Sequence, residues 1–202
     1  MEAVARLRQL LEAPPPRPVA ERCGFCGELV AEAHAHVVDI QKRGLLCACR
    51  ACYLLFTSPG AAQGRYRAVS DRYLHAAGLV LGPAQWDELQ IPVGIAFFFY
   101  NSAQQKTVAF YPSPAGATES ALPDRAWDEI ARDNPVLTSL APDTEALLVS
   151  RLPNHTDAFI VPIDACYELV GRIRRHWHGF GGGERVWAEI DAFFALLRER
   201  AG

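Results

Sequence analysis

The sequence predicts an α+β fold in which a small cysteine-rich N-terminal module precedes an antiparallel sheet with helices on one side. Three observations predict it. Five of the six cysteines in the chain fall between Cys23 and Cys52. Two pairs of apolar runs, each joined by a polar turn, follow in the middle of the chain, as in β-hairpins. The C-terminal part holds two segments whose apolar residues recur at helical spacing.

The composition is that of an ordinary globular protein, with 50% hydrophobic and 21% charged residues and a net charge of -3 over 202 residues. The longest apolar run, residues 91–100, is too short to span a bilayer as a helix, and the N-terminus lacks the apolar stretch of a signal peptide. We therefore expect a cytoplasmic protein with no membrane span. Thiols are kept reduced there, so clustered cysteines indicate a metal rather than disulfides.

The chain is predicted to divide into three parts. Residues 1–20 form a short helix and a proline-rich spacer, because three consecutive prolines cannot continue a helix. Residues 21–60 form the cysteine module, which ends at a Ser-Pro-Gly turn. Residues 61–202 form the α+β body.

Two hairpins are predicted in the body. Residues 91–100 are rich in strand formers without clean alternation, which predicts a central strand buried on both faces. Residues 107–111 return as its partner, and residues 112–120 (PSPAGATES) are predicted to form a loop of small residues. The runs 145–152 and 157–163 predict a second hairpin across PNHT.

Helices are predicted between and after these hairpins. A short one is expected near residues 124–132. Asp164 is predicted to cap the next helix, and a last helix begins at Glu184 after a glycine-rich break. The apolar stripe of the capped helix predicts the side that packs on the sheet, and it holds Cys166, Leu169, Val170, Ile173 and Trp177.

The cysteine spacing predicts a metal site. Cys23 and Cys26 form a C-x2-C-G knuckle, in which the glycine permits the tight turn that lets two thiolates bind one ion. Cys49 and Cys52 form a second pair after two β-like runs around QKRG, and YLLF after them is expected to open a helix. This order resembles that of a treble-clef finger or zinc ribbon. We expect one structural zinc ion per chain, with iron as the alternative.

Three further residues in the module leave alternatives open. Cys47 could replace Cys49 as a ligand, but we interpret it as a small core residue. His34 and His36 lie one strand period apart and could line the metal or bind a second ion. We interpret these two histidines as part of an exposed polar face of the hairpin.

Other candidate sites lie in the body. Ser113, Thr118 and Glu119 in the predicted loop could bind a small ligand or a partner. Cys166 at a helix start, with His155 in the preceding hairpin, could serve as a nucleophile, but its place on the apolar stripe indicates an inert buried thiol. The sequence carries no enzyme signature, so we do not predict an enzyme.

Several segments together resemble a family of uncharacterised proteins whose genes accompany uptake-type nickel–iron hydrogenase genes. The likeness runs over nearly the whole chain from about residue 20, and its segments are RCGFCGE, HVVD, LLCACRACYLLF, IPVGIAFFF, FYPSPAGATES, EALLV and VPIDACYELVGRIR. The resemblance implies an accessory, assembly or partner protein, with a hydrogenase component or a maturation protein as its partner. It supplies no catalytic residues.

The functional expectation is therefore a metal-binding accessory or partner protein of a nickel–iron hydrogenase system. The alternative is a rubredoxin-like iron carrier of electrons, although Cys52 is followed by Tyr53 and not by the glycine of a second iron knuckle. A further alternative is a zinc-ribbon regulator that binds nucleic acid through the basic and aromatic residues near Arg65 and Arg72. The overall acidity argues against nucleic acid as the partner.

Overall fold

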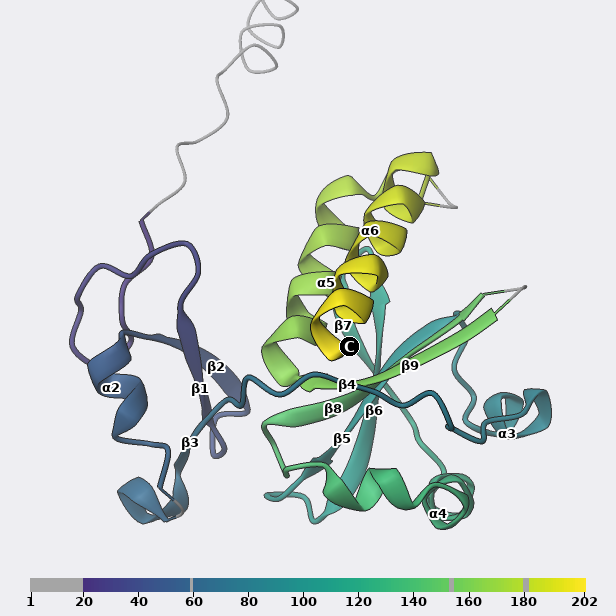
Figure 1. The fold of residues 1–202 in the computed structure, drawn as a ribbon, viewed down its shortest axis with the longest axis horizontal. Coiled ribbons are helices and arrows are strands. Elements are labelled where there is room, and N and C mark those ends of the chain that lie inside the picture. Colours follow the sequence, from purple (N-terminus) through teal and green to yellow (C-terminus); the bar gives the residue numbers. More distant parts are fainter. Residues whose placement is uncertain (1–19, 59, 153–154, 180–181) are drawn as a thin grey trace, which may run out of the picture.

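The computed structural model describes residues 20–202 except 59, 153–154 and 180–181, so the predicted helix and spacer over residues 1–19 lie outside the described residues. Two antiparallel sheets organise the described chain (Figure 1). The strand order is β2-β1-β3 in the smaller sheet and β4-β9-β8-β5-β6-β7 in the larger one.

The smaller sheet belongs to the cysteine module. Its elements are β1 (Ala35–Asp39), β2 (Gly44–Ala48), α2 (Arg50–Leu54), the 3-10 turn η1 (Ala61–Gly64) and β3 (Tyr66–Ala68). The hairpin expected around QKRG is formed by β1 and β2. β3 lies beyond the boundary expected at residue 60, yet it pairs with β1 and completes the sheet of the module.

The larger sheet and its helices form the body. In chain order the elements are β4 (Leu74–His75), α3 (Pro83–Glu88), β5 (Ile95–Asn101), β6 (Lys106–Ser113), β7 (Gly116–Ser120), α4 (Asp124–Asp133), η2 (Pro135–Ser139), β8 (Glu145–Leu152), β9 (His155–Pro162), α5 (Ile163–His176) and α6 (Glu184–Ala201). Both predicted hairpins are present, as β5–β6 and β8–β9.

β5 is a central strand with apolar side chains on both faces, which explains its unbroken hydrophobic run. Ile95 and Phe97 point into one core, while Ala96 and Phe98 point into another. Successive side chains of a strand alternate between the faces of a sheet, so such a strand needs cover on both sides.

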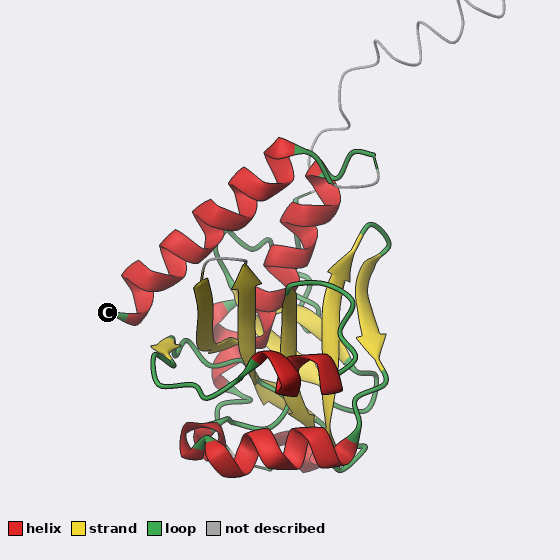
Figure 2. Cartoon of the chain, turned by 90° about the vertical axis from the view of Figure 1, so that its right-hand side faces the viewer, coloured by secondary structure: helices red, strands yellow, loops and turns green. Residues whose placement is uncertain are grey.

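The prediction that helices cover only one side of the sheet is wrong. Buried residues of α5 and α6 pack with one face of β5, β8 and β9. Residues of α3 and α4 pack with the other face, and both groups of helices are visible in Figures 1 and 2. The physical reason is the double burial of the central strands, which leaves apolar surface on each face.

Two local predictions are also corrected. Residues 112–120 do not form a loop, because β6 continues to Ser113 and pairs with β7 through the turn at Gly116, whose φ is +121°. Asp164 does not cap α5: the helix begins at Ile163 with Pro162 before it and makes no side-chain cap. The Asp164 carboxylate instead bonds to His36 of the module.

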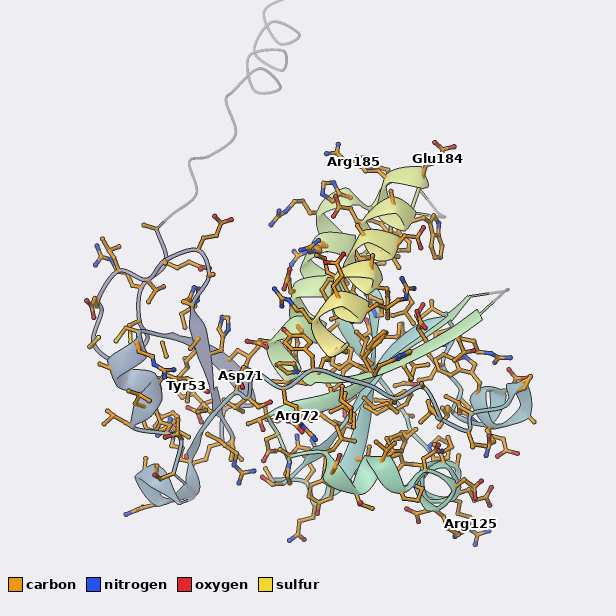
Figure 3. The ribbon with its side chains drawn as sticks, in the orientation of Figure 1. Tyr53, Asp71, Arg72, Arg125, Glu184 and Arg185 are labelled. Atoms are coloured by element: carbon orange, nitrogen blue, oxygen red, sulfur yellow. The ribbon has the colours of Figure 1, made fainter. Side chains whose placement is uncertain are left out.

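The module and the body share one buried core. Val38 and Val69 of the module lie in the same apolar cluster as Phe97 and Leu169 of the body. Polar contacts add to this junction, and they join Arg67 to Asp143, Arg72 to Glu145 and His36 to Asp164. Figure 3 labels Asp71 and Arg72 on the connection that leads from β3 into the body.

Candidate metal centre

Four cysteine sulfurs converge at one end of the module. The Sγ atoms of Cys23, Cys26, Cys49 and Cys52 all lie within 4.8 Å of one another. The Sγ atoms of Cys26 and Cys49 are 3.7 Å apart. A tetrahedral site with Zn–S bonds of about 2.3 Å has sulfur–sulfur edges of ~3.8 Å. The spacing of the sulfurs is therefore that of a four-thiolate metal centre.

The first pair of ligands is positioned by a tight backbone turn. The Gly27 N–H donates to the Cys23 carbonyl at 2.9 Å, and the Cys23 N–H donates to the Glu28 carbonyl at 2.8 Å. Gly27 has φ of +78°, in the left-handed region that side chains disfavour. The turn brings the Cys23 and Cys26 side chains to the same side of the chain.

The second pair lies where β2 gives way to α2. The Gly24 N–H donates to the Cys47 carbonyl at 2.8 Å, which ties the knuckle to β2. Cys49 directly precedes α2 and accepts from the Tyr53 N–H at 2.9 Å, so Cys52 lies in the first helical turn. A hairpin and a short helix thus hold the second pair against the first.

The thiols of Cys23 and Cys52 differ in pKa. Burial alone would raise the pKa of Cys23, but hydrogen bonds from the backbone of Cys49, Cys26 and Phe25 lower it to about 6. Burial and the neighbouring sulfurs raise the pKa of Cys52 to about 12. Like charges this close repel strongly, so a divalent cation is required before all four can be thiolates.

A small group of aromatic side chains lies beside the ligands, apart from the core that the module shares with the body. Phe25, Phe56 and Tyr66 pack together beside the knuckle, with ring centroids 4.7 Å to 5.3 Å apart. A module of this size gains much of its folding free energy from a bound metal, because the ligands would otherwise repel or lie exposed. Cys26 is exposed and Cys23 is buried, so the centre lies at the surface with one wall inside the module.

Cys47 lies in a different group from the four sulfurs. It shares a cluster with His34 and His36, in which one ligand atom from each residue lies within 4.8 Å of the others. The interpretation of the histidines as an exposed polar face is wrong, since the His34 side chain is 8% exposed and the His36 side chain 25%. Sequence reasoning missed Asp164 as a partner of this group, because the contact spans 128 positions of the chain.

The three polar residues of the β6–β7 hairpin have different surroundings. Thr118 Oγ1 donates to Ser113 Oγ at 2.9 Å, and Ser113 Oγ donates to the Gly116 carbonyl at 3.0 Å. Glu119 instead forms an ion pair with Arg43 of the module at 3.3 Å.

A cavity of about 590 Å³ lies between the β1–β2 hairpin and the body. Of the three residues that were predicted to lie in a ligand-binding loop, Glu119 lines this cavity, together with Arg43 and Tyr167. Ser113 and Thr118 form local hydrogen bonds within the hairpin, whereas the Glu119 carboxylate pairs with Arg43 of the module.

Cys166 has the surroundings of an inert thiol. It is completely buried in the core between α5 and the sheet. Burial raises the pKa of Cys166 well above its ordinary value, and the negative charge of Asp164 adds to this. A nucleophilic cysteine requires an accessible thiolate, which this position does not provide.

Comparison with protein families assigns the chain to one of them. The sequence model of a family of unknown function, DUF5947, matches residues 22–201. The chain belongs to DUF5947. The DUF5947 match includes all four clustered cysteines and runs on into α6, so it covers the module and the body together. No significant match was found among curated proteins or among solved structures.

Within the part of the chain that the structure describes, no helix has both the length and the apolar character needed to cross a bilayer.

Proposed function

We propose that this DUF5947 protein is a metal-binding accessory protein in which Cys23, Cys26, Cys49 and Cys52 hold one structural zinc ion. The observation that carries the proposal is the convergence of the four sulfurs at the distances of a tetrahedral site. Four protein ligands fill the coordination shell of zinc, so the ion stabilises the fold and leaves no position for a substrate. The order of knuckle, hairpin and helix supports a treble-clef arrangement.

Iron is the alternative metal, and it would make the protein a rubredoxin-like carrier of electrons. The second cysteine pair argues for zinc, because Cys52 lies in the first turn of α2 rather than in a second glycine knuckle. The two kinds of site differ in colour: zinc thiolate sites are colourless, whereas a ferric thiolate site absorbs visible light. The visible spectrum of the purified protein therefore distinguishes a structural zinc site from an iron site that carries electrons.

The partner that we propose is a component of a nickel–iron hydrogenase system or one of its maturation proteins. The support is the resemblance of the sequence segments described above. Reduced thiols suit the cytoplasm, where we place the protein. Glu119 and its hairpin neighbours Ser113 and Thr118 are the contact surface that we propose on the body, since Glu119 has a side chain 42% exposed.

Contacts of the basic residues favour a protein partner over nucleic acid. Arg65 pairs with Asp39, while Arg67 and Arg72 pair with carboxylates of the body. An arginine held by a carboxylate has its charge compensated, so these side chains make a weak phosphate-binding surface. Steeply salt-dependent binding to DNA or RNA would favour the nucleic-acid alternative instead.

Co-purification tests the proposed partnership. The full chain with an affinity tag would be expressed in a host that produces a nickel–iron hydrogenase, beside a Glu119→Ala variant and an Arg125→Ala control on the exposed side of α4. We expect hydrogenase or maturation proteins to co-purify with the wild type and the control, and less with Glu119→Ala. Absence of every such component from the wild-type eluate would contradict the proposed partnership while leaving the zinc site standing.

A further inference from the structure

A second group of side chains of the types that bind metals lies on the face of the β1–β2 hairpin that is turned toward the body. His36 and Cys47 are directly opposite each other in the β1–β2 register. His34 lies one strand period before His36, and the two rings have centroids 4.7 Å apart. One ligand atom from each of the three residues lies within 4.8 Å of the other two.

Hydrogen bonds determine which ring nitrogens are left to bind a metal. His34 Nδ1 lies 2.8 Å from the carbonyl oxygen of Ala31, and His36 Nδ1 lies 2.8 Å from Oδ2 of Asp164. A carbonyl oxygen and a carboxylate can only accept, so both Nδ1 atoms carry the proton and donate. In the neutral form of each ring, Nε2 then carries the free lone pair, which is the arrangement that orients metal-binding histidines in proteins.

The Nε2 atom of His34 provides independent evidence for a ligand. The His34 side chain is only 8% exposed, and its Nε2 is buried without any hydrogen-bond partner. Buried polar atoms in folded proteins nearly always have a partner, because an unpaired one costs stability. A metal ion bound to this lone pair would supply the partner.

We propose that His34 Nε2, His36 Nε2 and the Cys47 thiolate form a second transition-metal site that binds a late first-row divalent cation, of which Zn²⁺ is the most available. Two imidazoles and a thiolate suit such ions and not Mg²⁺ or Ca²⁺, which require oxygen ligands. No fourth Cys, His, Asp or Glu among the described residues joins the group. Three protein ligands leave one tetrahedral position for water or an exogenous ligand, unlike the closed four-cysteine site.

The second site would link the two parts of the chain. His34, His36 and Cys47 belong to the module, whereas Asp164 is the second residue of α5 in the body. The carboxylate of Asp164 holds the ring of His36 and so acts as a positioning residue. The site is separate from the four-cysteine centre, although Cys47 lies only two positions before Cys49.

Metal stoichiometry on the full-length chain tests this proposal. The wild type would be loaded with Zn²⁺, freed of excess metal and measured by mass spectrometry under native conditions, with the zinc environment read by X-ray absorption. We expect two zinc ions per chain and a mixed sulfur and nitrogen environment. Binding of a single zinc with sulfur ligands only, even in excess Zn²⁺, would overturn the proposal and leave the four-cysteine site intact.

Variants assign the ligands. His36→Gln and Cys47→Ser should each retain one zinc with sulfur ligands only, whereas His178→Gln, at an exposed histidine outside the group, should retain two. The retained sulfur-bound zinc reports that each variant has folded. Loss of the sulfur-only zinc in Cys47→Ser would instead make Cys47 a ligand of the first site and contradict the second.

Titration with Co²⁺ tests the positioning role of Asp164 in protein that carries one zinc ion, held by the four-cysteine site, with the second site empty. Asp164→Ala should bind the added Co²⁺ roughly 10–100-fold more weakly than the wild type. Asp164→Asn keeps an acceptor for the His36 Nδ1 proton and should recover most of the affinity. Equal Co²⁺ affinities for the wild type and Asp164→Ala would exclude the role of Asp164.

Discussion

At the scale of single residues, the clustered thiols differ in how readily they lose a proton. The pKa of Cys23 is lowered to about 6, so this thiol is largely ionised at neutral pH. The pKa of Cys52 is raised to about 12, chiefly by burial and then by the surrounding sulfurs. Metal binding must therefore displace a proton at least from Cys52, because zinc binds the thiolate form.

Zinc affinity is predicted to fall as the pH decreases. Protons compete with zinc for the sulfurs, and the raised pKa of Cys52 means that this competition persists above neutral pH. Calorimetric titration of the metal-free protein with Zn²⁺ in two buffers of different ionisation enthalpy measures the protons released. Identical apparent enthalpies in the two buffers would show that no proton leaves and would contradict the ionisation described here.

Gly27→Ala is predicted to destabilise the knuckle by about 1 kcal/mol, because a residue with a Cβ disfavours the left-handed region. The φ of Gly27 is +78°, and a Cβ built there meets no atom within 4 Å, so the cost is confined to the backbone. Gly44→Ala is the matched control: a Cβ there also meets nothing, and φ is not positive. Urea unfolding of the zinc-loaded proteins measures both, and equal midpoints would contradict the prediction.

The sequence allows the four-cysteine cluster to be predicted, but not the full surroundings of the histidines. Each C-x2-C pair indicates a local turn that brings its two sulfurs together. Such a turn depends only on a few adjacent residues, so it can be predicted from the sequence. The group of His34, His36 and Cys47 depends on the register of β1 against β2, which places His36 opposite Cys47. Its contact with Asp164 depends on the docking of the module on the body, for which the sequence carries no local signal.

At the scale of secondary-structure elements, unbroken apolar runs correctly indicated the central strands. The same runs also imply that both faces of the sheet are packed against other elements, so helices on only one side were the wrong prediction. The β7 strand could not be recognised, because its small residues and glycine resemble a loop and its pairing with β6 depends on the turn at Gly116. The sequence did not reveal β3 as a strand of the module, because β3 is short and pairs with β1, which is not its neighbour in the sequence.

Phe97→Ala is predicted to destabilise the body by roughly 3–5 kcal/mol, since it leaves a large cavity in a packed core. Phe97 is 1% exposed and packs against Phe110, with ring centroids 5.6 Å apart. Tyr100 lies on the same strand but is 41% exposed, so Tyr100→Ala should cost about 1 kcal/mol or less. Chemical denaturation gives both values, and similar losses for the two variants would contradict the assignment of the core.

At the scale of the whole molecule, the module and the body are held together by buried apolar contacts and by charged groups at their junction. Glu145 is 3% exposed and accepts from Arg72 Nε at 2.9 Å and from Ser70 Oγ at 2.8 Å. Burial alone would raise the pKa of Glu145, but Arg72, the Ala141 amide and Ser70 lower it below its ordinary value. The carboxylate therefore stabilises the folded chain when ionised.

Arg72→Ala is predicted to destabilise the protein by roughly 2–4 kcal/mol at neutral pH, because it leaves a buried carboxylate without its cation. Arg125→Ala, at an exposed position of α4, should have an effect within about 0.5 kcal/mol. A carboxylate whose pKa is lowered by folding stabilises the folded state fully above its unfolded pKa, which is about 4.3 for Glu. This stabilisation is lost as the pH falls through the pKa of the folded state. The difference between wild type and Arg72→Ala should thus shrink below about pH 4, and a difference that grows on acidification would contradict this account.

The most direct test of the central claim is the metal content and visible spectrum of the full-length protein purified without added metal, measured beside Cys52→Ala. A colourless wild type that retains zinc with four sulfur ligands, together with loss of that zinc in Cys52→Ala, is the predicted result. A wild type that carries no metal, or one that carries iron and is red until reduced, would contradict the structural zinc site.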